Sequence, residues 1–435
     1  MLKRQLLRLE SQPFRAVRPA RHVIHHPPPC IQSRNVSYVQ VKPVGLRTAI
    51  AWPNGVETTF DNQFLLDHCR CPKCFHPVTK QRLKSLFDFT PLVEPDAVEV
   101  DTKSVRIVWS DAHESRFPFS FLLRAAYDPP LAPREDEPDD RILWNSRISQ
   151  SPPIVQYQSL MIEEVGEEKA ELGILRWLRK VSDFGFCLVS DVPVSPQETQ
   201  KVIERIATIR PTHYGGFWDF TANMSLGDLA YSSQALPAHT DTTYFTDPAG
   251  LQIFHLLSHP SPPGTGGSTL LVDAFYSASL LSQLDPTAYS VLSRLRVPAH
   301  ASGTPGSLLR PVISQPTFRH DERGRLAQVR WNNEDRGVIG SRWTPGDVQS
   351  WYAAARRFEE ICRNEDTEYW VQLRPGTLLV IDNWRVMHGR SAFTGDRRMC
   401  GAYIGADDWR SRKAALEARF VSKAAGEDDI WESGW

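Results

Sequence analysis

The chain has 435 residues and a formal net charge of −1, and 41% of its residues are hydrophobic while 23% are charged. This composition is ordinary for a globular protein, and the length suggests two domains with an appended segment. Because it has no long basic run outside the N-terminus and no apolar run of membrane-spanning length, we expect neither a nucleic-acid partner nor a membrane partner.

Residues 1–34 are rich in arginine and poor in acidic residues. Six basic residues between Lys3 and Arg21 accompany a single acid, Glu10, and several leucines could form one apolar side of a short helix. An arginine-rich, acid-poor, amphipathic start is typical of a mitochondrial presequence. We therefore expect a mitochondrial matrix protein; the alternative is a basic tail without structure.

Residues 35–127 are predicted to form a small β-rich domain, because short β-branched runs alternate there with turn signals. Its cysteines are spaced Cys69-x-Cys71-x-x-Cys74, which is too tight for an easy disulfide and favours a metal. Structural zinc needs a fourth ligand, for which His68, His76 and His113 are candidates. The alternative is a set of reduced structural cysteines.

Residues 128–150 are acidic and proline-rich and are predicted to be a linker to a second domain, residues 151–435. Helical spacing marks residues 167–181 and 345–363, and short apolar strands are expected at 185–189, 250–255, 268–272 and 377–381. Helices that frame many short strands predict a mainly β (α+β) domain, a double-stranded β-helix of the jelly-roll kind.

Two distant segments of this second domain carry metal-ligand residue types. His239 and Asp241 would point to one face of a strand, and His388 follows an apolar strand far downstream. Two histidines and one carboxylate form the facial triad that leaves three iron positions open for a cosubstrate and O2. Spacing alone is a weak signal in a chain with 13 histidines.

Further polar residues suggest how this domain would bind carboxylates. Arg397, shortly after His388, suits bidentate capture of a carboxylate, whereas Arg398 would point to the opposite strand face. The alternative for Arg397 is a surface charge. Asn332 and Asn333, beside two acids, are candidates for binding the amino-acid end of a substrate, or else form an asparagine-rich turn.

Three motifs carry a family resemblance: LPAHTDTTYF at 236–245, GTGGSTLLVDAF at 264–275 and LVIDNWRVMHGRSAFTGDRRMCGAY at 379–403. They resemble the trimethyllysine and γ-butyrobetaine dioxygenase family, and the likeness extends from about residue 36 to 408. The resemblance implies hydroxylation of trimethyllysine to 3-hydroxy-trimethyllysine with Fe(II), 2-oxoglutarate and O2, which releases succinate and CO2 and begins carnitine biosynthesis. Ascorbate is the expected reductant. The alternatives are γ-butyrobetaine hydroxylation, the last step of that pathway, and an inactive β-helix scaffold.

The resemblance also implies roles for individual residues. The iron ligands would be His239, Asp241 and His388; His113 would complete the zinc site; and Arg397 with Thr269 would hold 2-oxoglutarate. A cage of aromatic rings would surround the trimethylammonium group, formed by Tyr214, Trp218, Tyr231 and Tyr403. Tyr214 and Trp218 would lie on one side of the chain if that stretch turns helically. The family further implies a homodimer.

Overall fold

In the computed structural model the chain divides into two compact units, one formed by Met1–Glu137 with Asp428–Trp435 and the other by Pro138–Glu427. The structure describes residues 39–421, except 89–91, 132–139, 222–231, 260–265 and 341, together with Trp431. The expected presequence therefore lies outside the described residues.

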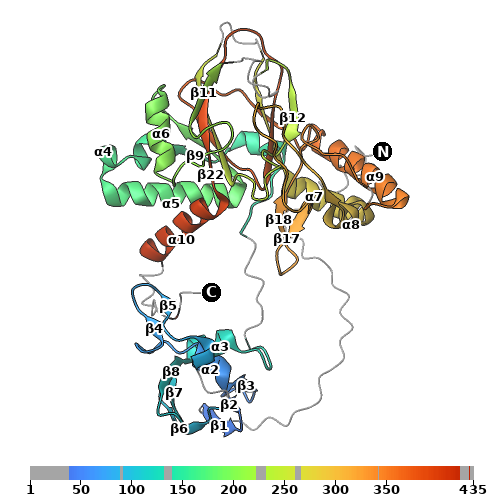
Figure 1. The fold of residues 1–435 in the computed structure, drawn as a ribbon. Coiled ribbons are helices and arrows are strands. Elements are labelled where there is room, and N and C mark those ends of the chain that lie inside the picture. The colour runs from blue at the N-terminus through green and yellow to red at the C-terminus, as the bar shows by residue number, and fades with distance from the viewer. Residues whose placement is uncertain are drawn as a thin grey trace. The chain divides into compact units, whose positions relative to one another are not determined.

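The first unit is β-rich, as predicted, and holds two three-stranded antiparallel sheets (Figure 1). In β7, Val105, Ile107 and Trp109 are buried at alternate positions, as a strand with one core-facing side requires. Trp431 joins this core, with its ring centroid 4.7 Å from that of Phe121. The elements are β1 (Gln40–Val44), β2 (Arg47–Ala51), β3 (Glu57–Asp61), α2 (Asn62–Asp67), β4 (Phe75–His76), β5 (Gln81–Arg82), β6 (Pro95–Val100), β7 (Ser104–Trp109), β8 (Glu114–Pro118) and α3 (Phe119–Ala125).

The second unit is organised around two sheets whose strands alternate along the chain. The larger sheet has the order β11-β22-β13-β20-β10-β9 and the smaller β12-β21-β14-β19. Their bounds are β9 (Ile154–Gln156), β10 (Phe186–Ser190), β11 (Trp218–Thr221), β12 (Leu236–His239), β13 (Leu251–Ser258), β14 (Thr269–Asp273), β19 (Tyr369–Val371), β20 (Leu378–Asp382), β21 (Val386–Arg390) and β22 (Arg398–Ile404). The predicted double-stranded β-helix is confirmed.

The larger sheet is buried on both faces, which explains why its strands read as continuous apolar runs. On β10, Phe186 and Leu188 belong to the core shared with the smaller sheet. Cys187 and Val189 face the other way and pack with Trp177 and its neighbours on the helical side. One short strand thus contributes to two cores.

Helices cover the outer faces of both sheets (Figure 1). The predicted helices at 167–181 and 345–363 are confirmed as α5 (Glu167–Phe184) and α9 (Pro345–Cys362). A glycine with φ 75°, Gly185, ends α5, and a Thr344–Asp347 capping box begins α9. The other helices are α4 (Ile162–Val165), α6 (Pro196–Glu204), α7 (Ala274–Leu284), α8 (Pro286–Arg294) and α10 (Ala406–Phe420).

Part of the segment expected to be a linker is folded. Trp144 is buried, its ring centroid lies 5.1 Å from that of Phe186, and a short 3-10 helix follows at Ser146–Gln150. Residues 140–150 therefore belong to the second unit. A buried ion pair near this segment joins Arg385 to Asp273 at 2.8 Å.

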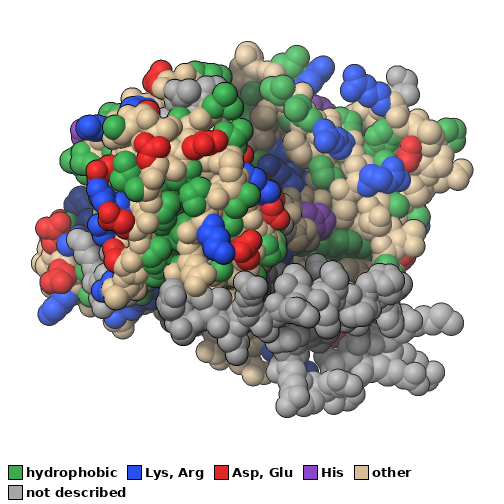
Figure 2. Space-filling model, turned by 90° about the horizontal axis from the view of Figure 1, so that it is seen from below, with side chains coloured by type: hydrophobic (Ala, Val, Ile, Leu, Met, Phe, Trp, Pro, Cys, Tyr) green, Lys and Arg blue, Asp and Glu red, His purple; other side chains and the backbone are tan. Residues whose placement is uncertain are grey.

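Across the described ranges, no helix combines the length and apolar character needed to cross a bilayer. Acidic and basic side chains are both spread over the face drawn in Figure 2. This distribution agrees with the balanced charge of the sequence.

Candidate active site and metal centres

Two neighbouring strands of the smaller sheet bring the histidines of the predicted triad together. His239 ends β12 and His388 lies in β21, and the two residues are directly paired across the antiparallel ladder. Their ring centroids are 4.5 Å apart. Residues 149 positions apart in the sequence therefore meet because strand pairing places them opposite each other.

Asp241 reaches the same point from a turn and not from the strand. We expected His239 and Asp241 to share a strand face, but β12 ends at His239. Thr242 then adopts φ 55°, an uncommon conformation for a β-branched residue. Asn383 holds this turn: its Oδ1 accepts from the Asp241 N–H at 2.7 Å and its Nδ2 donates to the Asp241 carbonyl at 3.0 Å. The strand argument was wrong, although the two side chains do converge.

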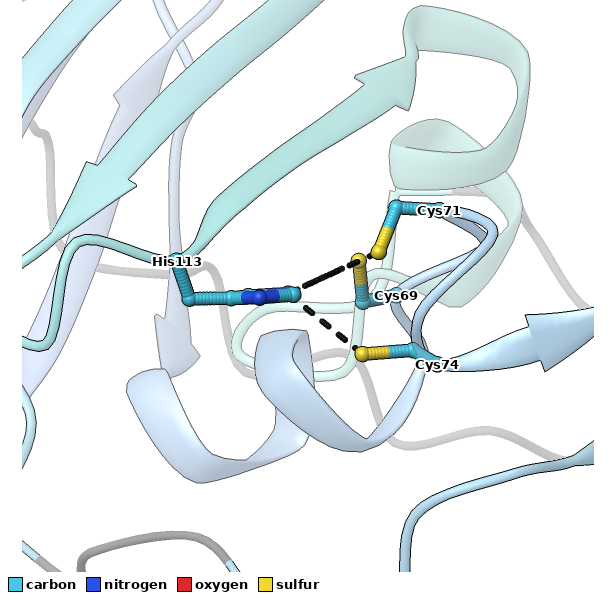
Figure 3. A group of neighbouring side chains, drawn as sticks. All are labelled: Cys69, Cys71, Cys74 and His113. Atoms are coloured by element: carbon cyan, nitrogen blue, oxygen red, sulfur yellow. Dashed lines mark hydrogen bonds between the residues drawn. The ribbon is translucent and has the colours of Figure 1, made fainter.

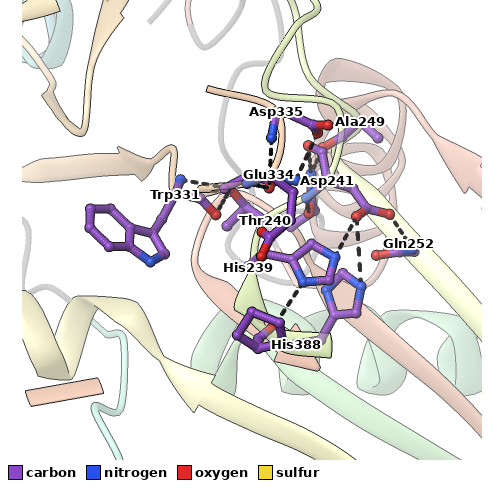
Figure 4. A network of polar contacts seen from close by, with 12 residues as sticks. His239, Thr240, Asp241, Ala249, Gln252, Trp331, Glu334, Asp335 and His388 are labelled. Atoms are coloured by element: carbon purple, nitrogen blue, oxygen red, sulfur yellow. Dashed lines mark hydrogen bonds and ion pairs between the residues drawn. The ribbon is translucent and has the colours of Figure 1, made fainter. Parts of the chain in front are cut away.

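The three side chains fit one metal ion (Figure 4). Asp241 Oδ1 lies 3.2 Å from His239 Nε2 and 3.7 Å from His388 Nε2. The Nδ1 of His239 lies 2.8 Å from the Pro237 carbonyl, and this contact orients the ring with Nε2 toward Asp241. All three ligand atoms lie within 4.8 Å of one another. This donor set is that of a facial triad, which suits Fe(II).

The protonation states of the triad also suit a cation. Burial opposes ionisation of Asp241, but the charge of His388, the hydrogen bond and charge of His239 and the hydrogen bond from Tyr403 hold its pKa well below its usual range. Burial lowers the pKa of His388 to about 3. Burial works against protonation of His239 too, yet Asp241 raises its pKa to about 9. A metal that binds here therefore replaces a proton between the carboxylate and His239.

The triad opens into a cavity of about 340 Å³ in the second unit. This volume is in the range of small-molecule sites. Of the residues expected to hold cosubstrate and substrate, those that line it are Tyr214, Trp218, Thr269, Asn332, Arg397 and Tyr403. Tyr231 lies outside the described residues. Asn333 is exposed and is absent from the cavity lining.

The two adjacent arginines near the end of the motif separate as expected. Arg397 is buried and lines the cavity, while Arg398 is exposed and pairs with Asp219. Among the described residues no carboxylate pairs with Arg397, and its Nε has no hydrogen-bond partner. Burial, followed by the neighbouring charge of Arg390, lowers the pKa of Arg397 to about 10, so it remains a cation at neutral pH. A buried guanidinium without a counter-ion is a site for an anion.

Aromatic rings line another part of the cavity. The stretch from Tyr214 to Trp218 does not turn helically, the condition under which the two rings would share one side; Trp218 begins strand β11 and packs beside Phe220 and Phe254. A side chain at Gly401, its cross-strand partner, would overlap the Trp218 ring. Tyr244, which the sequence reasoning missed, also lines the cavity, and its hydroxyl lies 3.2 Å from that of Tyr214.

Asn332 is engaged with its own turn. Its Nδ2 donates to Asp335 Oδ2 at 2.7 Å, and its Oδ1 accepts from the backbone N–H groups of Glu334 and Asp335 at 3.0 and 3.2 Å. Glu334 and Asp335 line the cavity with it. The amide thus positions the two acids, and the carboxylates become the groups that face a ligand.

A second candidate metal centre lies in the first unit (Figure 3). His113 Nε2 lies 3.4 Å from the Sγ atoms of Cys69 and Cys74 and 3.8 Å from that of Cys71. Tetrahedral zinc with ordinary bond lengths separates nitrogen and sulfur ligands by about 3.6 Å. His68 is turned elsewhere, with Nδ1 2.8 Å from the Phe64 carbonyl. Of the three histidines considered, the geometry selects His113.

Comparisons with known proteins show to which family the chain belongs. The model of the "Taurine catabolism dioxygenase TauD, TfdA family" matches residues 153–403, and that of "Gamma-butyrobetaine hydroxylase-like, N-terminal" matches residues 39–123. Trimethyllysine dioxygenase of Neurospora crassa is 42% identical over 82% of this chain and 80% of its own. The chain belongs to the trimethyllysine dioxygenase family. It is therefore a 2-oxoglutarate-dependent dioxygenase.

Two further relatives bear on the substrate and the compartment. The Homo sapiens protein, named trimethyllysine dioxygenase, mitochondrial, is 37% identical over 80% of each chain. The γ-butyrobetaine dioxygenase of a Pseudomonas species is 28% identical over 85% of this chain and 93% of its own. The trimethyllysine relatives are thus the more similar of the two groups.

Proposed function

We propose that this enzyme hydroxylates N6,N6,N6-trimethyllysine at C3, using Fe(II), 2-oxoglutarate and O2 and releasing succinate and CO2. The observation that carries the proposal is a single cavity lined by the triad, by the buried Arg397 and by the rings of Tyr214, Trp218 and Tyr403. The names of the relatives with 36–42% identity agree with this substrate.

Each part of the cavity has a task in this reaction. His239, Asp241 and His388 would hold the iron. When bound, the iron would supply O2 activation coupled to the oxidation of 2-oxoglutarate, and a substrate C–H bond would be hydroxylated. Arg397 pairs with the distal carboxylate of 2-oxoglutarate, and the Thr269 hydroxyl donates to it. Thr269 and Arg390 are directly opposite each other across the β14–β21 ladder. Thr269 begins β14 and Arg397 directly precedes β22, so two strands hold the groups that orient the cosubstrate.

The trimethylammonium group of the substrate has no N–H to donate. Aromatic faces recognise it instead, because the ring quadrupole attracts a weakly hydrated cation. Tyr214, Trp218, Tyr244 and Tyr403 supply such rings in this cavity. We assign them the quaternary ammonium, with Tyr231 as a fifth candidate.

The other end of trimethyllysine is an amino acid, and here it differs from γ-butyrobetaine. Trimethyllysine carries an α-ammonium group beside its carboxylate, whereas γ-butyrobetaine carries a carboxylate alone. Glu334 and Asp335 offer two carboxylates on one wall of the cavity. Such a wall attracts the α-ammonium of trimethyllysine and repels the bare carboxylate of γ-butyrobetaine, which favours trimethyllysine.

Product analysis tests this assignment. Purified enzyme is given Fe(II), 2-oxoglutarate, ascorbate and either trimethyllysine or γ-butyrobetaine, and products are identified by NMR. We expect 3-hydroxy-trimethyllysine, with one succinate per product, and little conversion of γ-butyrobetaine. A neutral analogue with a tert-butyl carbon in place of the quaternary nitrogen matches the shape without the charge. Equal turnover of that analogue would reduce the aromatic cage to a hydrophobic pocket.

Three further parts of the proposal concern the whole protein. Cys69, Cys71, Cys74 and His113 bind structural zinc, because all four positions of a tetrahedral site are filled by protein and none is left for catalysis.

The chain acts in the mitochondrial matrix, as the arginine-rich start and the names of the vertebrate relatives suggest. It forms a homodimer, as expected from the family.

A further inference from the structure

The two oxygens of the Asp241 carboxylate have different surroundings. Oδ1 faces the ring nitrogens of His239 and His388, at 3.2 and 3.7 Å. Oδ2 accepts a hydrogen bond from the Tyr403 hydroxyl at 2.6 Å and a short one from the Gln252 amide. Figure 4 shows the carboxylate between the histidine rings on one side and Gln252 on the other. Only Oδ1 is directed at the metal position.

The larger sheet fixes both donors. Gln252 of β13 and Tyr403 of β22 are directly paired across the antiparallel ladder. Both side chains are buried, and the Gln252 amide nitrogen lies 3.5 Å from the Tyr403 hydroxyl. The donors therefore approach Oδ2 as a pair whose spacing is set by the backbone. Asp241, by contrast, lies in a turn and depends on its contacts for its orientation.

Burial of the Gln252 amide at this position is energetically unfavourable. Its neighbours Leu251 and Ile253 are fully buried in the apolar core on the opposite face of the sheet. Its own Oε1 is buried and has no partner among the described residues. A buried amide with one unmet hydrogen bond costs free energy relative to an apolar side chain of similar size. The hydrogen bond that it does make, to Asp241, accounts for a polar residue here.

We infer that Gln252 and Tyr403 are positioning residues that restrict Asp241 to a single ligating oxygen. A carboxylate that used both oxygens would occupy one of the three metal positions that 2-oxoglutarate and O2 require. With Oδ2 held by two donors, Oδ1 alone is offered to the iron. This inference rests on the proposed function, because it assigns the iron to the triad.

The same arrangement gives Tyr403 a second role. Its ring lines the substrate cavity while its hydroxyl holds the iron ligand. The two roles are separable, because phenylalanine keeps the ring and removes only the hydroxyl. Tyr403→Phe should therefore disturb the metal site and leave the trimethyllysine KM within about threefold, whereas Tyr403→Leu should also raise that KM.

The test uses Co(II) in place of Fe(II), because its d–d absorption reports both affinity and coordination geometry. Wild type, Tyr403→Phe and Gln252→Leu, each with one equivalent of zinc already bound at Cys69, Cys71, Cys74 and His113, are titrated with Co(II), with thermal unfolding as a check of the fold. Loss of such a supporting hydrogen bond weakens metal affinity by roughly 10- to 100-fold. We expect at least a tenfold loss in each variant, with altered absorption bands. Tyr244→Phe is the matched control: it loses a cavity hydroxyl that faces Tyr214 and should bind Co(II) as wild type does.

Wild-type Co(II) affinity and spectra in both variants would overturn the inference. If Gln252→Leu fails to fold, the isosteric Tyr403→Phe decides alone. His388→Ala separates this question from the proposed function. Should it bind Co(II) as tightly as wild type, the metal lies elsewhere and the assignment of the triad fails, together with the positioning role. If His388→Ala loses Co(II) while the positioning variants retain it normally, only the inference fails.

Discussion

Arg397 offers the sharpest test of the cosubstrate site, because its neighbour is a built-in control. Arg397 is buried in the cavity and has no carboxylate partner among the described residues, whereas Arg398 is exposed and paired with Asp219. We predict that Arg397→Ala raises the KM for 2-oxoglutarate and leaves the KM for trimethyllysine nearly unchanged. Arg398→Ala removes the same charge one residue away and should change neither.

The magnitude follows from the burial of the guanidinium. Removing one partner of a buried, hydrogen-bonded charge pair costs about 2–5 kcal/mol, which is roughly 30-fold to several thousand-fold in affinity. Arg390 lines the same cavity and keeps one positive charge near the ligand, so we expect the lower end of that range, about 30-fold. An exposed pair such as Arg398–Asp219 contributes about 0–1 kcal/mol, which is less than about fivefold.

The assay measures succinate release against 2-oxoglutarate concentration at saturating trimethyllysine, and thermal unfolding checks the fold of both variants. An unchanged 2-oxoglutarate KM in Arg397→Ala would refute the assignment. A shift in Arg398→Ala alone would mean that the two neighbouring arginines exchange places on binding.

Three further outcomes are expected. Asp273→Ala leaves the buried Arg385 without its carboxylate partner, so urea unfolding should register a loss of about 3–5 kcal/mol; a loss below about 1 kcal/mol would contradict the structural importance of this pair. Zinc should remain equimolar with protein after the iron is stripped, and Cys74→Ser should lose it; elemental analysis that finds no zinc in wild type would remove the site. Trp218→Leu should weaken trimethyllysine binding by about 2- to 30-fold, the contribution of one ring, without changing the 2-oxoglutarate KM. Equal effects on both ligands would point to a collapsed cavity.

The spacing of apolar residues and the chemistry of individual residues were sufficient to predict much of the fold. The helices α5 and α9 have clear helical spacing with end signals, Gly185 and Thr344, so their bounds could be approximated closely. The cysteine motif indicated a metal by its spacing alone, but three histidines were available as the fourth ligand. Only the folded unit, in which β7 and β8 bring His113 to the cysteines, selects one.

Local sequence patterns did not predict the geometry of turns or the pairing of residues that are far apart in the sequence. Asp241 was expected on a strand because two-residue spacing fits a strand, yet its turn depends on Asn383, which lies 142 positions away. The four-residue spacing of Tyr214 and Trp218 allowed a helical turn, but Trp218 lies in β11 and is paired with Gly401 of β22. The place of Trp431 in the core of the first unit also has no signal in the sequence around it.

The residues that were missed, Gln252, Asn383 and Tyr244, each contact a site residue through tertiary structure that no local sequence pattern encodes. Gln252, like His255, is a buried polar residue in the otherwise apolar strand β13, and that anomaly is the one local sign of its role. For its partner Tyr403, the family resemblance predicted a role for the aromatic ring. It did not show which residue the Tyr403 hydroxyl contacts. Asn383 sits beside Trp384 in the turn before β21, and one amide there contacts both Asp241 and the Ala249 carbonyl. The segment that leads into His388 thus holds the turn that carries Asp241. The same set of contacts thus holds the side chains of His239, Asp241 and His388 in position before a metal binds.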